Sequence, residues 1–157
     1  MRQIFSFLLA SLLMVISFSC KKGNEYPIEP EIKFKSLTTE KDGQGKDIYA
    51  TLTISFTDGD GDIGADDGNN NFIVGYYRKQ NNIWTLDASY DYSGRIKVVT
   101  STGKSRALRG DISYDIDQAV MPQGAVNDTV RFNVYIYDRA QHQSNTVTTS
   151  EIVINTY

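Results

Sequence analysis

The chain has 157 residues, which fits one domain better than two, and 40% of them are hydrophobic, too many for an intrinsically disordered protein. Its 16 Lys and Arg and 19 Asp and Glu give a formal net charge of -3. This charge argues against a nucleic-acid partner, because such a protein needs a basic face to neutralise phosphates. A single cysteine and a single histidine exclude a disulfide framework and any zinc site built from several Cys or His residues.

The N-terminus has the pattern of a secretion signal. Arg2 supplies a positive charge, and residues 4–18 form an apolar run of about 15 residues, short for a membrane span of roughly 20. The only cysteine, Cys20, follows this run directly and is preceded by the small residue Ser19. This junction resembles the lipobox of bacterial lipoproteins, in which the signal is cut before an acylated cysteine. The resemblance implies a signal peptide over 1–19 and lipidation of Cys20; the alternative is an ordinary secretory signal with an incidental cysteine.

The segment over 20–30 is polar and contains Gly23, Pro27 and Pro30, which predicts a short extended tether before a folded domain over 31–157. In the lipoprotein resemblance, Lys21 stands where an aspartate is associated with retention in the inner membrane. By this analogy we expect a chain anchored in the outer membrane, on its periplasmic or its cell-surface face. The membrane, reached through the lipid, is thus one expected partner.

From residue 31 onward the apolar residues recur with a period of two, which is typical of strands with one buried and one exposed face. The expected strands are 31–37, 47–57, 72–79, 83–88, 95–100, 106–117, 129–138 and 146–155. Seven or eight short strands predict an all-β fold, an immunoglobulin-like antiparallel sandwich of two sheets. A closed barrel is the alternative, although uneven strand lengths and a long loop after residue 57 favour the sandwich.

Two stretches resemble known proteins. Residues 129–154 resemble the last two strands of immunoglobulin-like and cadherin-like bacterial domains, without the two cysteines of antibody domains. The only tryptophan, Trp84, is expected to be a packing residue. The sequence FTDGDGDIG over 56–64 resembles a stretch of small uncharacterised Gram-negative lipoproteins with an immunoglobulin-like domain. That resemblance implies the same fold and location and brings no known activity.

The loop after the second expected strand is strongly acidic. Its carboxylates are Asp58, Asp60, Asp62, Asp66 and Asp67. No Lys or Arg occurs between Lys46 and Arg78, so these like charges need a cation or water to screen them. The intervening glycines, Gly59, Gly61 and Gly64, tolerate positive φ and let the chain curl until alternate carboxylates point at one centre. Because all-oxygen ligands suit Ca²⁺, the sequence predicts a structural calcium ion.

This loop is not an EF-hand, because a loop beginning at Asp58 would need Gly at 63 and Glu at 69 and has Ile63 and Asn69 instead. In an immunoglobulin-like sandwich, however, the loop after the second strand and the loop that begins near residue 138 lie at the same end. Asp138 is therefore expected to complete the metal site from across the sandwich, with Asn145 or a backbone carbonyl nearby. The alternatives are a solvated acidic turn without an ion and a site for another cation.

The sequence contains no pattern that predicts an enzyme. His142 lies in a polar turn, where we expect it to be exposed, and there is no strand–turn–helix nucleophile motif. We expect instead a non-enzymatic interaction or accessory module of the cell envelope, with a protein or glycan partner. Glycan binding would use tyrosines on a sheet face, namely Tyr76, Tyr77, Tyr90, Tyr92, Tyr135 and Tyr137. One exposed row of tyrosines would favour this alternative, and tyrosines divided between both faces would favour a plain scaffold.

Overall fold

The computed structural model describes residues 26–66, 68–100, 106–117, 122 and 125–156. The signal peptide, the acylated Cys20 and the metal ligand Asp67, all expected from the sequence, lie outside these residues. The strands are β1 (Glu31–Lys41), β2 (Asp47–Asp58), β3 (Phe72–Gln80), β4 (Ile83–Asp91), β5 (Leu108–Asp117), β6 (Asp128–Ile136), β7 (Val147–Thr148) and β8 (Ile152–Ile154).

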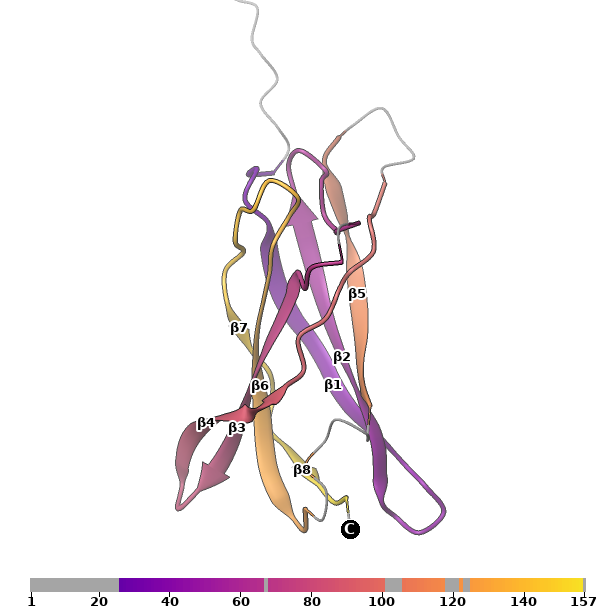
Figure 1. Ribbon diagram of the computed structural model, residues 1–157, viewed down its shortest axis with the longest axis vertical. Helices are drawn as coiled ribbons and strands as arrows, with labels where there is room; N and C mark the ends of the chain where they lie inside the picture. The colour runs from indigo at the N-terminus through magenta and orange to yellow at the C-terminus, as the bar shows by residue number, and fades with distance from the viewer. Residues whose placement is uncertain (1–25, 67, 101–105, 118–121, 123–124, 157) are drawn as a thin grey trace, which may run out of the picture.

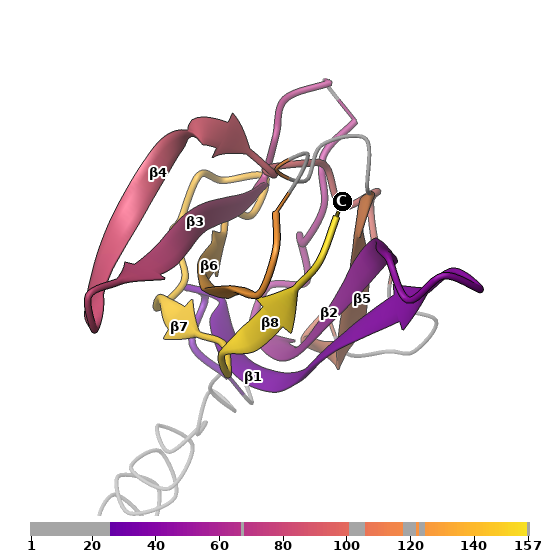
Figure 2. The same cartoon turned by 90° about the horizontal axis from the view of Figure 1, so that it is seen from below.

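The described strands form two antiparallel sheets that face each other (Figures 1 and 2). One sheet has three strands in the order β1-β2-β5, and the other has five, in the order β4-β3-β6-β7 with β8 also paired to β6. This is the order of an immunoglobulin-like sandwich, in which the first two strands and the fifth share one sheet. The predicted fold class is confirmed, and the closed-barrel alternative is wrong because β5 and β4 each form an edge.

The alternating pattern of the sequence decides which face of each strand is buried. On β2, Leu52 and Ile54 are fully buried. Thr51, Thr53 and Ser55, which alternate with them, point outward and are partly exposed. Each large apolar side chain buried in this way contributes about 1.5–3 kcal/mol relative to exposure. A slip of one residue would expose the whole buried set, so the core fixes the register of β2 against β1 and β5.

The expected strand at 95–100 does not form. Among the described residues, the only bridge near it pairs Gly94 with Phe72. The segment instead runs from the five-stranded sheet to the three-stranded sheet and bonds to the acidic loop. Ala65 N donates to the Ile96 carbonyl at 3.0 Å, and Val99 N donates to the Ile63 carbonyl at 3.1 Å. The apolar residues of 95–100 alternate as in a strand because this connecting segment also has one buried side, on which Ile96 lies.

Three chain segments meet at one end of the sandwich (Figure 1): the N-terminal segment at Tyr26–Pro27, the loop after β2 and the turn after β6. The amide of Gly59 donates to the Pro27 carbonyl at 2.7 Å, which holds the first two of these segments together. The isolated bridge between Ile63 and Asp138 holds the loop against the turn. Residues far apart in the sequence are thereby brought to one place.

Candidate metal centre

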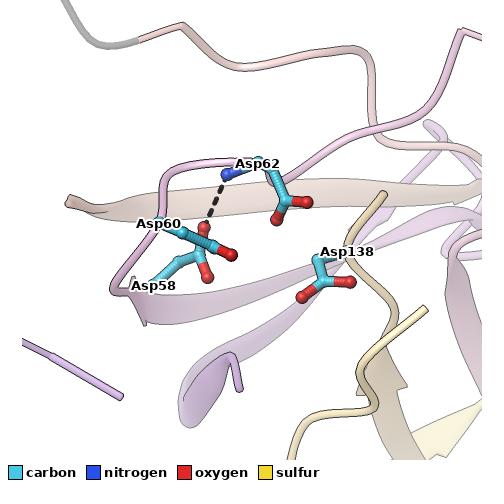
Figure 3. Close-up of side chains that lie close together, drawn as sticks. All are labelled: Asp58, Asp60, Asp62 and Asp138. Atoms are coloured by element: carbon cyan, nitrogen blue, oxygen red, sulfur yellow. Dashed lines mark hydrogen bonds between the residues drawn. The ribbon is translucent and has the colours of Figure 1, made fainter. Parts of the chain in front are cut away.

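Four carboxylates converge at this end of the sandwich (Figure 3). Asp58, Asp60 and Asp62 come from the loop after β2, and Asp138 comes from the turn after β6. One oxygen of each carboxylate lies within 4.8 Å of one oxygen of every other. Asp58 and Asp138 are 0% and 1% exposed, whereas Asp60 and Asp62 are partly exposed, so the centre is half-buried at this end of the sandwich. A group of this kind can hold a metal ion.

The loop curls because its backbone is tied to its own first carboxylate. Asp58 Oδ2 accepts a hydrogen bond from the Asp62 amide at 2.8 Å, which closes a tight turn over Asp60. Gly61 has a φ of 73° and Gly64 a φ of 103°, a left-handed region that residues with a Cβ rarely adopt. A Cβ on Gly61 would also lie 1.7 Å from the Arg106 carbonyl oxygen. The alternation of Asp and Gly therefore serves both backbone conformation and close packing.

Gly59 serves a different purpose from the one expected, because its φ is not positive. A Cβ at this position would lie 2.2 Å from the Tyr26 carbonyl oxygen and 2.5 Å from that of Pro27. Glycine is needed here because the N-terminal segment crosses directly over the loop. The residues that lead toward Cys20 thus pack against the candidate metal centre.

The turn after β6 is fixed to the loop through Asp62. The Asp62 carbonyl accepts a hydrogen bond from the Arg139 amide at 3.2 Å, and Asp62 Oδ2 accepts one from the Ala140 amide at 3.1 Å. The Arg139 guanidinium also donates to the Ile63 carbonyl at 3.4 Å. These contacts place Asp138 opposite the loop carboxylates, as the sandwich topology predicted.

His142 holds Asp138 in place, although the sequence indicated only an exposed turn residue. Its side chain is 35% exposed, its amide donates to Asp138 Oδ1 at 2.8 Å, and its Nδ1 lies 2.8 Å from Asp138 Oδ2. Donation by the ring requires the proton on Nδ1, and the hydrogen bond to the carboxylate raises the pKa of His142. Each carboxylate oxygen has a second lone pair, so Asp138 remains able to bind a cation while bonded to His142.

Three loop oxygens in the cluster have no hydrogen-bond donor. They are Asp58 Oδ1, Asp60 Oδ1 and Asp62 Oδ1, and all three are buried. A buried polar atom without a partner costs about 1–3 kcal/mol, and more when it is charged. Within the described part of the chain the protein itself does not supply what these oxygens need. A bound cation would satisfy all three at once.

The same crowding shifts the pKa values of the loop carboxylates. Burial, together with the negative charges of Asp60, Asp62 and Asp138, raises the pKa of Asp58 to about 6, against the opposing effect of the Asp62 amide. The pKa of Asp62 is raised by burial first and then by Asp138 and Asp60, while Arg139 opposes the shift. Without a cation, the ionised cluster is therefore electrostatically unfavourable at neutral pH.

Other residues expected at the site lie elsewhere. Asp66 is exposed and lies outside the four-carboxylate cluster. Asn145 is engaged with the backbone of β1: its Oδ1 accepts from the Ile32 amide at 2.8 Å, and its Nδ2 donates to the Ile32 carbonyl at 2.9 Å. Asn145 therefore helps to hold β1 against the segment between β6 and β7.

The tyrosines considered for glycan binding are divided between the two faces of the five-stranded sheet. Tyr76, Tyr90 and Tyr92 form an aromatic cluster with Phe132 on the inner face. Tyr77, Tyr135 and Tyr137 alternate with buried residues and point outward. Trp84 also lies on the outside, where the Arg131 guanidinium covers its ring at 4.3 Å. This division favours a scaffold over a tyrosine platform for sugars.

Comparison with known proteins adds no relatives: no family model, no curated protein and no solved structure matches the chain. Within the described ranges, no helix has the length and apolar character needed to cross a membrane.

Proposed function

We propose that the chain is a lipid-anchored, non-enzymatic protein of the cell envelope whose β-sandwich is stabilised by one Ca²⁺ ion bound to Asp58, Asp60, Asp62 and Asp138. The observation that carries the calcium proposal is the set of three buried loop oxygens without donors, which converge with Asp138. An acidic turn that was merely solvated would expose these oxygens to water.

The size and chemistry of the centre favour calcium over other cations. Ca²⁺ binds oxygen ligands at about 2.3–2.6 Å, so opposite ligands lie about 4.6–5.2 Å apart. Oxygens within 4.8 Å of one another can all contact one such ion. Mg²⁺ keeps several of its waters and demands a smaller octahedron, which suits a buried group of carboxylates poorly. The four carboxylates would supply part of the six to eight calcium ligands, and backbone carbonyls or waters the rest.

The role proposed for the ion is structural. It would neutralise the loop after β2 and join it to the turn after β6, and the N-terminal segment packs against the same loop through Gly59. Extracellular modules bind calcium with a Kd of roughly 10⁻⁴–10⁻³ M. A ligand that binds only the folded state adds about 2.7 kcal/mol of stability at a hundredfold excess over Kd.

Thermal unfolding of the mature chain tests this proposal. We expect CaCl₂ in the millimolar range to raise the Tm, a chelator to reverse the rise, and MgCl₂ at the same ionic strength to have a much smaller effect. No calcium-dependent rise, even at about tenfold above the weak end of that affinity range, would leave the solvated acidic turn as the correct interpretation.

Membrane anchoring through Cys20 is proposed from the lipobox-like junction of the sequence. Several acyl chains would anchor the protein firmly, because each buried CH₂ contributes about 0.8 kcal/mol. In a bacterium that expresses the full chain, we expect the wild type to incorporate labelled palmitate and to sediment with membranes, whereas Cys20→Ser does neither. Equal behaviour of the two proteins would contradict anchoring at Cys20.

Placement in the outer membrane rests on the analogy at Lys21 and on the resemblance to small Gram-negative lipoproteins. Separation of the two membranes on a density gradient tests it, and a protease added to whole cells distinguishes the cell-surface face from the periplasmic face. Recovery of the labelled chain in the inner membrane would overturn the placement.

Glycan binding through surface tyrosines is the second candidate function. Its remaining support is the outward position of Tyr77, Tyr135 and Tyr137 on β3 and at the end of β6. Part of this aromatic surface is already used within the protein, because Arg131 lies over both Trp84 and Tyr77 and the rings of Tyr135 and Tyr137 pack edge to face. Loss of binding on a glycan array after Tyr77→Ala would support it, and an unchanged array would contradict it.

A further inference from the structure

A second feature of the chain lies on the outer face of the three-stranded sheet, near the end that the N-terminal segment crosses. A cavity of about 530 Å³ opens there, and its volume lies in the range of small-molecule sites. It is lined by Tyr26 from the N-terminal segment and by residues of β1, β2 and β5, which point outward except for the buried Phe56. The metal centre lies at the same end but does not line this cavity.

The register of the sheet explains the shape of the cavity. One row across the three strands is Glu31, Thr57 and Arg109, and the next is Lys33, Ser55 and Asp111. The central strand thus presents short hydroxyl side chains, while both edge strands present charged ones. Such rows form a trough with a hydroxyl floor and charged walls.

The hydroxyl groups of this trough make fewer side-chain hydrogen bonds than those farther along the same face. Thr51 donates to Asp115 at 2.7 Å, and Thr53 lies 3.0 Å from the Ser113 hydroxyl. By contrast, Ser55 and Thr57 make no side-chain hydrogen bond with another described residue. The unbonded hydroxyls therefore coincide with the cavity, which is where a ligand could use them.

The charges of the walls indicate the charge of the ligand. Glu31 pairs with Lys33 at 3.4 Å, and Asp111 pairs with Lys35 at 2.6 Å. Arg109 makes no ion pair with any residue that the structure describes, so one positive charge is left over. A guanidinium binds a planar carboxylate through two parallel hydrogen bonds. A doubly charged phosphate would be repelled more strongly than a carboxylate by the two wall carboxylates, Glu31 and Asp111.

We infer that this cavity binds a singly charged, hydroxyl-bearing carboxylate, of which a uronic acid residue of an acidic polysaccharide is the fitting class. Arg109 takes the carboxylate. Ser55 and Thr57 bond the sugar hydroxyls from below, and Glu31 and Asp111 accept hydrogen bonds from hydroxyls at the walls. The site uses neither the calcium ligands nor the tyrosines of the opposite sheet, so it is independent of the proposed function.

Titration of the mature, unlipidated chain with sodium glucuronate tests the inference, with amide shifts in an NMR spectrum as the readout. We expect saturable shifts at Ser55, Thr57 and Arg109 and a millimolar Kd. Glucose lacks the carboxylate and acetate lacks the ring hydroxyls, so each should bind at least about tenfold more weakly, the worth of one charged hydrogen bond. Equal binding of glucose or acetate, tighter binding of inorganic phosphate, or shifts that lie elsewhere would overturn it.

Arg109→Gln should weaken glucuronate binding by about 10- to 100-fold, because it removes the charge and the paired hydrogen bonds. Arg95→Gln is the matched control, since Arg95 is also exposed and lies outside the cavity lining. Loss of binding in Arg109→Gln alone supports the inference. Unchanged binding in Arg109→Gln, or equal loss in both variants, contradicts it.

Discussion

Asp58 ends β2 in the three-stranded sheet and Asp138 lies in the turn after β6 of the five-stranded sheet, yet one carboxylate oxygen of each lies within 4.8 Å of the other and both residues are buried. Two buried negative charges at this separation repel each other unless a cation lies between them. The hydrogen bonds from His142 to Asp138 and from the Asp62 amide to Asp58 position the pair, and His142 adds a positive charge beside Asp138 when it is protonated. The calcium proposal follows from this relationship, and five predictions test it and the structure around it.

Loss of one loop carboxylate should remove most of the response to calcium. The wild-type Tm is expected to rise by about 5–10 °C at a hundredfold excess of calcium over Kd. Asp60→Asn should abolish most of this rise, because Asp60 contributes a buried oxygen to the cluster. Asp66→Asn is the matched control and should keep the rise, since Asp66 lies outside the cluster. Loss of the rise in both variants would show that the total charge of the loop matters and the cluster does not, and a full rise in both would contradict Asp60 as a ligand.

The metal-free protein should become less stable as the pH rises from about 4 to about 7. The pKa of Asp58 is raised from 3.8 to about 6 in the folded state, so the folded chain binds this proton more tightly than the unfolded chain. Asp58 therefore favours folding at acidic pH, and this contribution is lost as the pH rises through the folded-state pKa of about 6.

The substitution Asp58→Asn tests this pH-dependent loss of stability. The pKa shift of Asp58 corresponds to about 3 kcal/mol of penalty at neutral pH. In chelator, Asp58→Asn should be more stable than the wild type at pH 7 and nearly equal to it at pH 4, as measured by urea unfolding. A variant less stable than the wild type at pH 7 would mean that the charge of Asp58 is already compensated within the protein.

His142 should act on calcium affinity by holding Asp138. Removal of the partner that orients a metal ligand typically weakens affinity by about 10- to 100-fold. His142→Ala should therefore raise the calcium concentration at half-saturation by about tenfold or more. Gln143→Ala, in the same turn, should leave it unaltered, because Gln143 bonds to Tyr137 at the surface. Equal calcium titrations of His142→Ala and the wild type would show that His142 does not position Asp138 for calcium binding.

Gly61 should tolerate no side chain. Gly61→Ala places a Cβ 1.7 Å from the Arg106 carbonyl oxygen in addition to forcing a positive φ, so the loop must move. We expect a loss of more than about 1 kcal/mol of stability and loss of the calcium response. Gly68→Ala isolates the conformational part, because Gly68 has a φ of 84° and no neighbour within 4 Å of an added Cβ. If both variants lost the same stability, the contact with Arg106 would be unimportant.

The segment before β1 should contribute to the metal end of the domain. The sequence predicts a tether up to residue 30, but the Pro27 carbonyl accepts a hydrogen bond from Gly59. A chain that begins at Pro30 should therefore unfold several degrees below one that begins at Lys21, the loss expected for a hydrogen bond of about 1 kcal/mol. The comparison is made in calcium and in chelator. Identical Tm values in both conditions would show that the tether is structurally passive.

The sequence was enough to predict most strands and the carboxylates of the loop, because both depend on local patterns of residues. A period of two identified β2, β5 and β6, and the spacing of Asp58, Asp60 and Asp62 identified the loop. Asp138 could be predicted as a ligand only from the expected topology, because a sandwich places the two loops at the same end.

Other features depend on contacts that no local pattern records. Residues 95–100 alternate like a strand, yet they bond to the acidic loop and to no sheet. The sequence around His142 predicts a surface residue, but in the folded turn after β6 the His142 ring contacts the Asp138 carboxylate. Gly59 is needed because Tyr26 and Pro27 cross over it, and this contact is set only when the N-terminal segment meets the folded loop.

The most direct test of the calcium site is diffraction from a crystal of the mature domain soaked in CaCl₂, with anomalous scattering used to locate the ion. The account predicts one peak among Asp58, Asp60, Asp62 and Asp138, at about 2.3–2.6 Å from their oxygens. No peak at this position in calcium well above the expected Kd, with the four carboxylates bonded to ordered water instead, would contradict it.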